Sequence, residues 1–148
     1  MILISHRGNT AGSSPEQENK PHYIETAIYL GYDVEIDIWG DGVQFWLGHN
    51  QPDTLIDQSF LYKHIDKLWC HAKSAIVLKE LMDLNMHCFF HDQDNMTLTS
   101  KNYIWVYPTY KYLNGYCIIV HPEKYGVDFR YAAGVCSDYV DNIKRSIE

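Results

Sequence analysis

The sequence predicts a single α/β domain built on a parallel sheet, and three observations lead to this prediction. Short apolar segments of strand length alternate with segments of helical periodicity. Several strand segments are nearly continuous hydrophobic runs, which is typical of parallel strands covered on both faces. The 148 residues are 46% hydrophobic and can bury one core. No linker or repeat divides residues 1–148, so we expect one domain.

Seven strands and one hairpin follow from the apolar segments and the turn residues between them. The hairpin turns on Gly40-Asp41-Gly42. The expected strands are residues 2–6, 33–38, 67–72, 87–91, 103–107, 116–120 and 134–138, and the hairpin strand is 43–48.

Helices fit between several of these strands. An apolar stripe at helical spacing begins near Pro21, which suits a first turn, and ends at Gly31, which suits a C-cap. A second stripe follows Ser74, a suitable N-cap residue. Shorter helices are expected over residues 58–65 and 140–147, whereas the connection between Tyr107 and Tyr116 is too short for a helix and is expected to be a loop. This alternation fits an open doubly wound sheet or a closed barrel, and a barrel of this length must be abbreviated, because ordinary ones need about 250 residues.

Composition narrows the possible partners and the compartment. The formal net charge is −7, which argues against general nucleic-acid binding but not against a small phosphate-bearing substrate. Four cysteines lie in separate apolar segments with no C-x-x-C pair, as expected for reduced, buried thiols in a cytosolic protein. The N-terminus does not resemble a signal peptide, and no segment is long enough to span a membrane. We therefore expect a cytoplasmic protein without stable membrane insertion.

Charged and imidazole side chains follow the first two expected strands. The first strand ends in His6-Arg7-Gly8, and an arginine flanked by glycine suits a phosphate group. Glu35 and Asp37 project from one face of the second strand, where they could hold one hard cation together. With His49, His6 could supply the base and acid for phosphodiester cleavage. Taken singly, each histidine could equally be structural, and the acids could lie on a solvated face.

In this order, the motifs resemble those of the glycerophosphodiester phosphodiesterase family, within the phospholipase C-like phosphodiesterase superfamily. The resembling segments are His6-Arg7-Gly8, Glu18-Asn19, residues 31–37, Asp41-Gly42-Val43, His49-Asn50 and residues 134–139. The resemblance implies an abbreviated TIM-type (β/α) barrel in which loops replace some helices. It also implies metal-dependent hydrolysis of a small glycerophosphodiester, an activity of lipid metabolism.

The resemblance also assigns roles to individual residues. By this resemblance, His6 and His49 are the acid–base pair. Arg7, Lys73 and Glu18 bind the phosphate, and Glu35 and Asp37 are metal ligands. His71 stands where the family has a third carboxylate ligand. Mg²⁺ or Ca²⁺ is the cofactor that the family implies, whereas an imidazole ligand at position 71 favours softer ions such as Mn²⁺ or Zn²⁺.

Two other functions remain open at this stage. One is a phospholipase D-type lyase acting on lysophospholipid head groups, because related toxins share the His…Glu-x-Asp…His layout. The other is a non-catalytic phosphate-binding barrel, which the small size and His71 favour, whereas both histidines, Arg7 and Lys73 oppose it. The sequence does not indicate the alcohol group of the substrate or the oligomeric state.

Overall fold

Ten strands and five helices make up the part of the chain that the computed structural model describes, residues 1–107 and 115–148. The strands are β1 Ile2–His6, β2 Asp33–Gly40, β3 Phe45–Leu47, β4 Thr54–Ile56, β5 Leu68–Ala72, β6 Cys88–Phe89, β7 Met96–Leu98, β8 Ile104–Val106, β9 Cys117–Val120 and β10 Gly134–Ser137. The helices are α1 Pro21–Tyr29, α2 Gln58–Lys63, α3 Ala75–Asp83, α4 Pro122–Tyr125 and α5 Val140–Ile147.

All ten strands belong to one mixed sheet. Seven of them run parallel in the spatial order β6-β5-β2-β1-β10-β9-β8. The hairpin of β3 and β4 continues antiparallel from the end of β2, and β7 pairs antiparallel with β8. The first and last strands are therefore neighbours inside the sheet, with Ile4 opposite Cys136 and Ser5 opposite Ser137.

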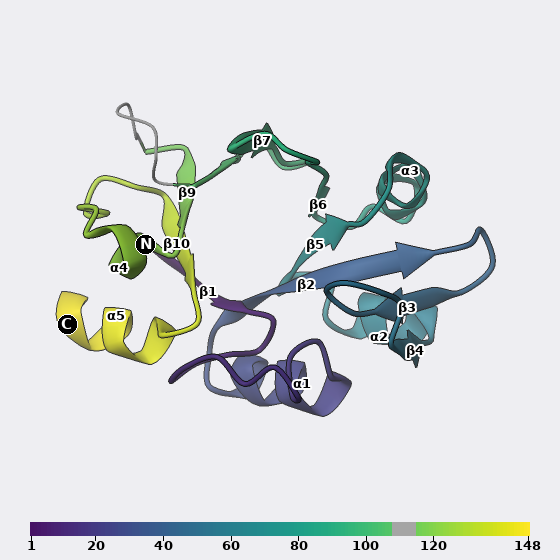
Figure 1. The fold of residues 1–148 in the computed structure, drawn as a ribbon, viewed down its shortest axis with the longest axis horizontal. Helices are drawn as coiled ribbons and strands as arrows, with labels where there is room; N and C mark the ends of the chain where they lie inside the picture. The colour runs from purple at the N-terminus through teal and green to yellow at the C-terminus, as the bar shows by residue number, and fades with distance from the viewer. Residues whose placement is uncertain (108–114) are drawn as a thin grey trace.

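The sheet curves strongly, and Figure 1 shows its strands arranged around a common centre with the helices outside them. Within the described residues, no ladder joins β6 to β7 or β8. Other hydrogen bonds cross this gap, among them those from Ser100 N to Cys88 O at 2.8 Å, from Cys88 N to Ser100 Oγ at 2.9 Å and from Thr97 Oγ1 to Phe90 O at 2.8 Å. The segment around β7 therefore contacts the β6 segment on one side of this gap and β8 on the other.

Alternate residues of the strands point to two separate cores. The outer face, covered by α1, α2 and α3, includes Val34, Ile36 and Ile38 of β2, all fully buried. A second outer cluster lies under α5. The inner face gathers side chains from six strands: Ile4, Trp69, Phe89, Trp105, Ile118, Val120 and Cys136. Glu35 and Asp37 also lie on this inner face, as the alternation along β2 requires.

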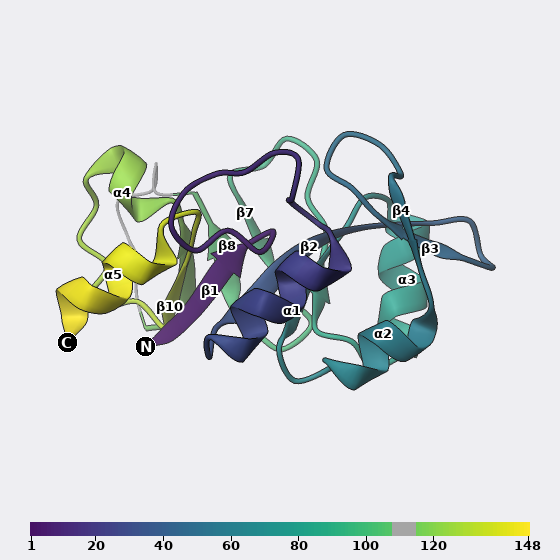
Figure 2. The same ribbon diagram turned by 90° about the horizontal axis from the view of Figure 1, so that it is seen from below.

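Helix boundaries follow the capping residues. Pro21 is in the first turn of α1, and Gly31 follows its C-cap with φ +96°. Ser74 caps α3, because its side chain accepts a hydrogen bond from Val77 N at 3.2 Å. Figure 2 shows that α1, α2 and α5 lie on the same side of the sheet as one another, outside β1 and β2.

The base of the inner face is closed by an aromatic group around His87. Its ring lies 3.9 Å from that of Trp69, centroid to centroid, and its Nε2 is 2.8 Å from Thr99 Oγ1. Only 4% of His87 is exposed. Burial, with a smaller contribution from the charge of Lys101, lowers the pKa of His87 to about 4.

The expected α/β class and each expected strand and helix are confirmed, with ends shifted by a few residues. β4, β7 and α4 were not predicted, and β3, β4 and β7 make the sheet mixed. The predicted loop between Tyr107 and Tyr116 falls largely on residues 108–114, outside the described residues. The four cysteines are buried and form no disulfide among the described residues, as expected. No helix in the described ranges is long and apolar enough to cross a membrane.

Candidate active site at the carboxyl ends of the parallel strands

The eight site residues that the sequence predicts all come together at one end of the sheet. His6 and Arg7 follow β1, Glu35 and Asp37 lie on β2, and His71 lies on β5. Six of the eight line a cavity of about 300 Å³, which also contacts aromatic and imidazole side chains of neighbouring strands. Its polar and aromatic lining consists of His6, Arg7, Glu35, His49, His71, Lys73, His91, Trp105 and Tyr107. Asp37 and Glu18 lie directly behind this lining, in contact with Arg7.

One buried carboxylate, that of Glu35, lines the cavity, and a second, that of Asp37, lies directly behind the lining. Glu35 is 2% exposed and Asp37 is fully buried. Burial and the neighbouring Asp37 raise the pKa of Glu35 well above its usual range. Burial would also raise the pKa of Asp37, but the His49 and His71 imidazoles and the charges of Arg7 and Lys73 outweigh it and hold that pKa well below its usual range. The pKa values of the two acids are therefore shifted in opposite directions, although both acids belong to one strand.

Asp37 is the centre of the ion-pair network. Its Oδ2 accepts from Arg7 Nε at 2.8 Å and from Asn19 Nδ2 at 3.0 Å. Its Oδ1 lies 3.2 Å from Lys73 Nζ and 3.1 Å from His71 Nδ1. Both predicted phosphate-binding side chains, Arg7 and Lys73, are thus held by a carboxylate, and both residues line the cavity.

Glu18 holds Arg7 from the other side. Its Oε2 accepts from Arg7 Nη1 at 3.3 Å, and its Oε1 accepts from Asn9 Nδ2 at 2.9 Å and from Ser13 Oγ at 2.7 Å. Burial opposes ionisation of Glu18, but these donors and the Arg7 charge lower its pKa. Glu18 therefore fixes the guanidinium plane and contributes no side chain to the 300 Å³ cavity.

The two predicted acid–base histidines are held differently. His6 Nδ1 donates to Asp138 Oδ1 at 2.7 Å, which leaves its Nε2 facing the cavity, 3.8 Å from Glu35 Oε2. Burial lowers the pKa of His6 more than the Asp138 hydrogen bond raises it. The His49 side chain is 47% exposed at the mouth of the cavity, with its Nδ1 2.6 Å from Arg7 Nη2.

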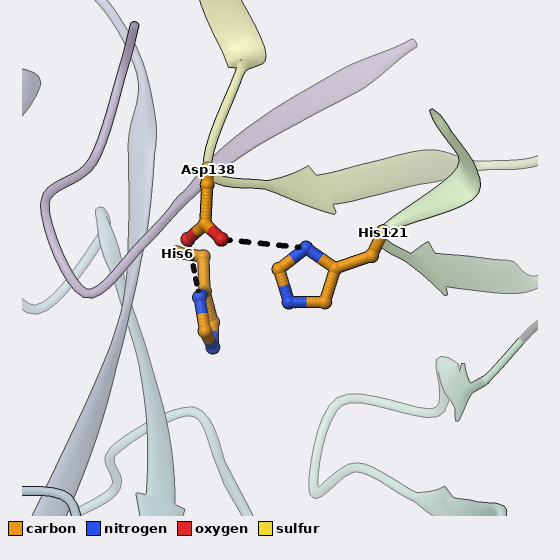
Figure 3. Close-up of side chains that lie close together, drawn as sticks. All are labelled: His6, His121 and Asp138. Atoms are coloured by element: carbon orange, nitrogen blue, oxygen red, sulfur yellow. Dashed lines mark hydrogen bonds and ion pairs between the residues drawn. The ribbon is translucent and has the colours of Figure 1, made fainter. Parts of the chain in front are cut away.

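Several residues of this site were not assigned a role from the sequence. Asp138 was recognised only as part of a strand motif, and Asn19 only as part of a motif before the first helix. His121 was assigned nothing, yet its ring meets that of His6 edge to face at 4.6 Å (Figure 3). Its position directly after β9 could have indicated it, because side chains at the carboxyl ends of parallel strands gather on one side. His91 stacks on His71 with the ring centroids 4.7 Å apart.

Strained backbone is concentrated here. Among the described residues, five that are not glycine have positive φ, and three of these belong to this site: Arg7 (56°), Asn19 (60°) and His121 (50°). Left-handed backbone costs energy in residues with a Cβ and persists only where the surroundings impose it, often at functional sites. Gly8 next to Arg7 has φ +94°, and a Cβ there would lie 2.6 Å from Tyr23 Cδ1.

The donors fit a divalent cation between β2 and β5. Glu35, Asp37 and His71 each present a ligand atom within 4.8 Å of the others. Glu35 Oε2 is buried and has no hydrogen-bond partner, an arrangement that a bound cation would relieve. Two carboxylate oxygens and one imidazole nitrogen suit Mn²⁺ or Zn²⁺ better than the all-oxygen sites typical of Ca²⁺.

A second group that could hold a cation consists of His6, His121 and Asp138. These three residues come from the ends of β1, β9 and β10, which are neighbours in the sheet.

Comparison with known proteins adds nothing to this geometry: no protein-family model, no curated protein and no solved structure matches the chain.

Proposed function

We propose that this protein is a metal-dependent phosphodiesterase that cleaves a small glycerophosphodiester-like molecule. One observation carries the proposal. A cavity large enough for a phosphodiester group is bordered by four imidazoles, those of His6 and His49 among them, and by an arginine and a lysine; the Glu35 carboxylate also lines it, and that of Asp37 lies directly behind the lining. Phosphodiester cleavage needs a base, an acid, and positive charge near the phosphate oxygens, and this set provides each of them.

In the proposed reaction, Arg7 and Lys73 bind the phosphate oxygens and offset the charge that develops in the transition state. A hydroxyl of the substrate attacks phosphorus and gives its proton to His6 Nε2, while the bond from phosphorus to the leaving oxygen breaks. His49 protonates that oxygen. A water molecule then opens the cyclic phosphate with the two histidines in reversed roles.

Asp138 is a positioning residue in this scheme. Because it accepts the Nδ1 proton of His6, it fixes the tautomer with the Nε2 lone pair toward the cavity. It also stabilises the imidazolium that forms when Nε2 takes a proton. Asn9 Nδ2 donates to the same carboxylate oxygen at 2.9 Å and holds it in place.

Glu35, Asp37 and His71 would hold the metal in this proposal. When bound, the metal would neutralise phosphate charge and lower the pKa of a coordinated hydroxyl. The ammonium of Lys73 and the guanidinium of Arg7 pair with the same Asp37 carboxylate.

We further propose that the sheet is an abbreviated TIM-type (β/α) barrel. Two features support this: the inner-face core takes side chains from six strands, and hydrogen bonds from Thr97 and Ser100 cross from the β7 segment to the β6 segment. Catalytic groups at the carboxyl ends of strands are the rule in such barrels.

The direct test is an assay with bis(p-nitrophenyl) phosphate and with glycerophosphodiesters in the presence of Mg²⁺, Ca²⁺, Mn²⁺ or Zn²⁺. We expect turnover with at least one metal and a fall of about 10²-fold or more in His6→Ala, because general acid–base catalysis contributes on that scale. His22→Ala is the matched control, since His22 is exposed on α1 and its side chain bonds only to Gln17 among the described residues.

Metal binding is tested separately by thermal shift. The purified protein should be stabilised by the metal that supports turnover, and Glu35→Gln should lose most of this stabilisation while it keeps the folded-state spectrum. No turnover with any of the four metals, together with no metal-dependent thermal shift, would refute the proposed function.

A further inference from the structure

A compact cluster lies beside the cavity, where β1, β9 and β10 end. His6 and His121 approach Asp138 from two sides (Figure 3). His6 Nδ1 is 2.7 Å from Asp138 Oδ1, and His121 Nδ1 is 3.8 Å from Asp138 Oδ2. One carboxylate therefore presents an oxygen to each of two imidazoles.

The imidazole of His121 is buried, but one of its nitrogens lacks a hydrogen-bond partner. The residue is only 6% exposed, and its Nδ1 has no hydrogen-bond partner. Figure 3 shows this nitrogen directed at the Asp138 carboxylate. The backbone is fixed, because His121 N donates to Cys136 O at 2.7 Å and Pro122 begins α4 immediately afterwards. Buried imidazole nitrogens normally have a partner, so a nitrogen held in this way indicates a ligand.

The charges around the cluster also favour a cation. The only positive side chain within 4 Å of Asp138 Oδ2 among the described residues, apart from the histidines, is Lys124, with its Nζ at 3.6 Å. Half of the Lys124 side chain is exposed, so it can leave without opening the core. Glu123 Oε1 lies 3.5 Å from His121 Nδ1 and is held there by Ser137 Oγ at 2.8 Å. A second carboxylate thus adds negative charge beside the imidazole.

We propose that His6, His121 and Asp138 form a second cation site, which takes Zn²⁺ or a similar borderline transition metal. Two imidazole nitrogens and one carboxylate oxygen are a typical zinc donor set, and three protein ligands leave a fourth position open. His6 Nδ1 lies 2.7 Å from Asp138 Oδ1 and His121 Nδ1 lies 3.8 Å from Asp138 Oδ2, and one ligand atom from each of the three residues lies within 4.8 Å of the others. Small side-chain adjustments would bring three such atoms to the spacing of about 3.3 Å that bonds of about 2.0–2.1 Å in a tetrahedron require. On binding, the metal replaces the Nδ1 proton of His6, which is released to solvent.

This site does not depend on the proposed phosphodiesterase activity. It uses Nδ1 of His6, whereas the proposed base is Nε2 of the same ring, directed at the Glu35 side. His6 therefore stands between the two groups of donors, and occupation of the second site would change the basicity of Nε2. Zinc at this site would accordingly regulate any chemistry in the cavity.

The experiment is a Co²⁺ titration of the metal-free protein, followed by visible absorption and by the number of ions retained after gel filtration. We expect the wild-type protein and the surface control His22→Ala to bind two ions. His121→Ala and Glu35→Gln should each bind one, and the tetrahedral Co²⁺ bands should remain in Glu35→Gln and disappear in His121→Ala.

The outcomes separate this proposal from the proposed function. A single ion that is lost in His121→Ala and kept in Glu35→Gln would support the second site alone. A single ion that is kept in His121→Ala, equal binding in both variants, or no binding at all would overturn the inference. If His121→Ala does not fold, the ¹⁵N resonance of His121 Nδ1 in the wild-type protein decides the question: it should shift with Zn²⁺, and an unchanged resonance at saturation refutes the site.

Discussion

His87 at the base of the inner face provides a quantitative prediction that is independent of the proposed function. The change is His87→Gln, which keeps a polar group near Thr99 Oγ1 but removes a titrating ring. In the folded protein the pKa of His87 is lowered to about 4, while in the unfolded chain it returns to about 6.5. The folded protein therefore binds a proton at this ring only at a lower pH than the unfolded chain does.

The sign and size of the effect follow from this difference. Between pH 6.5 and pH 4 the unfolded chain binds a proton at this position and the folded protein does not, so the free energy of unfolding falls as the pH falls. The slope approaches about 1.4 kcal/mol per pH unit, and the total approaches about 3 kcal/mol over the 2.5 units between the two pKa values. Above pH 7 the titration of His87 no longer changes the free energy of unfolding with pH.

Urea denaturation at pH 7.0, 6.0, 5.0 and 4.5 measures this effect. The difference in unfolding free energy between the wild-type protein and His87→Gln should shrink steadily as the pH falls, because only the wild-type protein pays for the neutral ring. Because both proteins contain the other titrating groups, the difference between them removes the contribution of those groups to the pH dependence. His6 and His91 are examples, and burial lowers their pKa values too. Parallel stability curves for the two proteins across this pH range would show that His87 does not titrate as the structure requires.

Three further outcomes are expected. Gly8→Ala should cost about 1–3 kcal/mol, because φ +94° and the contact with Tyr23 both oppose a Cβ; an unchanged midpoint in denaturant would contradict the local geometry. Ser74→Ala should cost about 1 kcal/mol through loss of the α3 cap, measured by thermal unfolding against Ser74→Asp, which retains a cap and should stay near wild type. Asp37→Asn should destabilise the metal-free protein by about 3–5 kcal/mol, since it removes the carboxylate that pairs with Arg7 and Lys73. Glu35→Gln should change stability little, and equal losses in the two variants would be inconsistent with the opposite pKa shifts of the two acids.

The elements of the first half of the chain could be predicted because local rules act there. The alternation of Val34, Ile36 and Ile38 with Glu35 and Asp37 indicated which side chains face the inside, and the structure confirms it. Pro21, Gly31 and Ser74 marked helix ends through requirements of single residues. Each of these inferences needs information from fewer than about ten consecutive residues, the scale on which periodicity and capping operate.

The remaining features depend on contacts between distant residues. Asp138 bonds to His6 across 132 positions of sequence, and only the pairing of β1 with β10 brings them together. His121 was missed because a single histidine before a proline forms no local motif, although its place directly after an expected strand could have indicated it. β7 was missed because it has only three residues and its two apolar ones, Met96 and Leu98, are exposed.

The place of β10 in the sheet has a consequence for biosynthesis. β10 is the last strand along this sequence, yet it lies between β1 and β9, in the middle of the parallel order. Until it emerges from the ribosome, β1 and β9 each keep an unpaired edge, which invites association with other chains. Asp138 follows directly after β10, so a nascent chain also lacks the partner of His6. Correct folding and a complete site should therefore arise together, only after β10 has been synthesised, and the edges of β1 and β9 stay open to other chains until that moment.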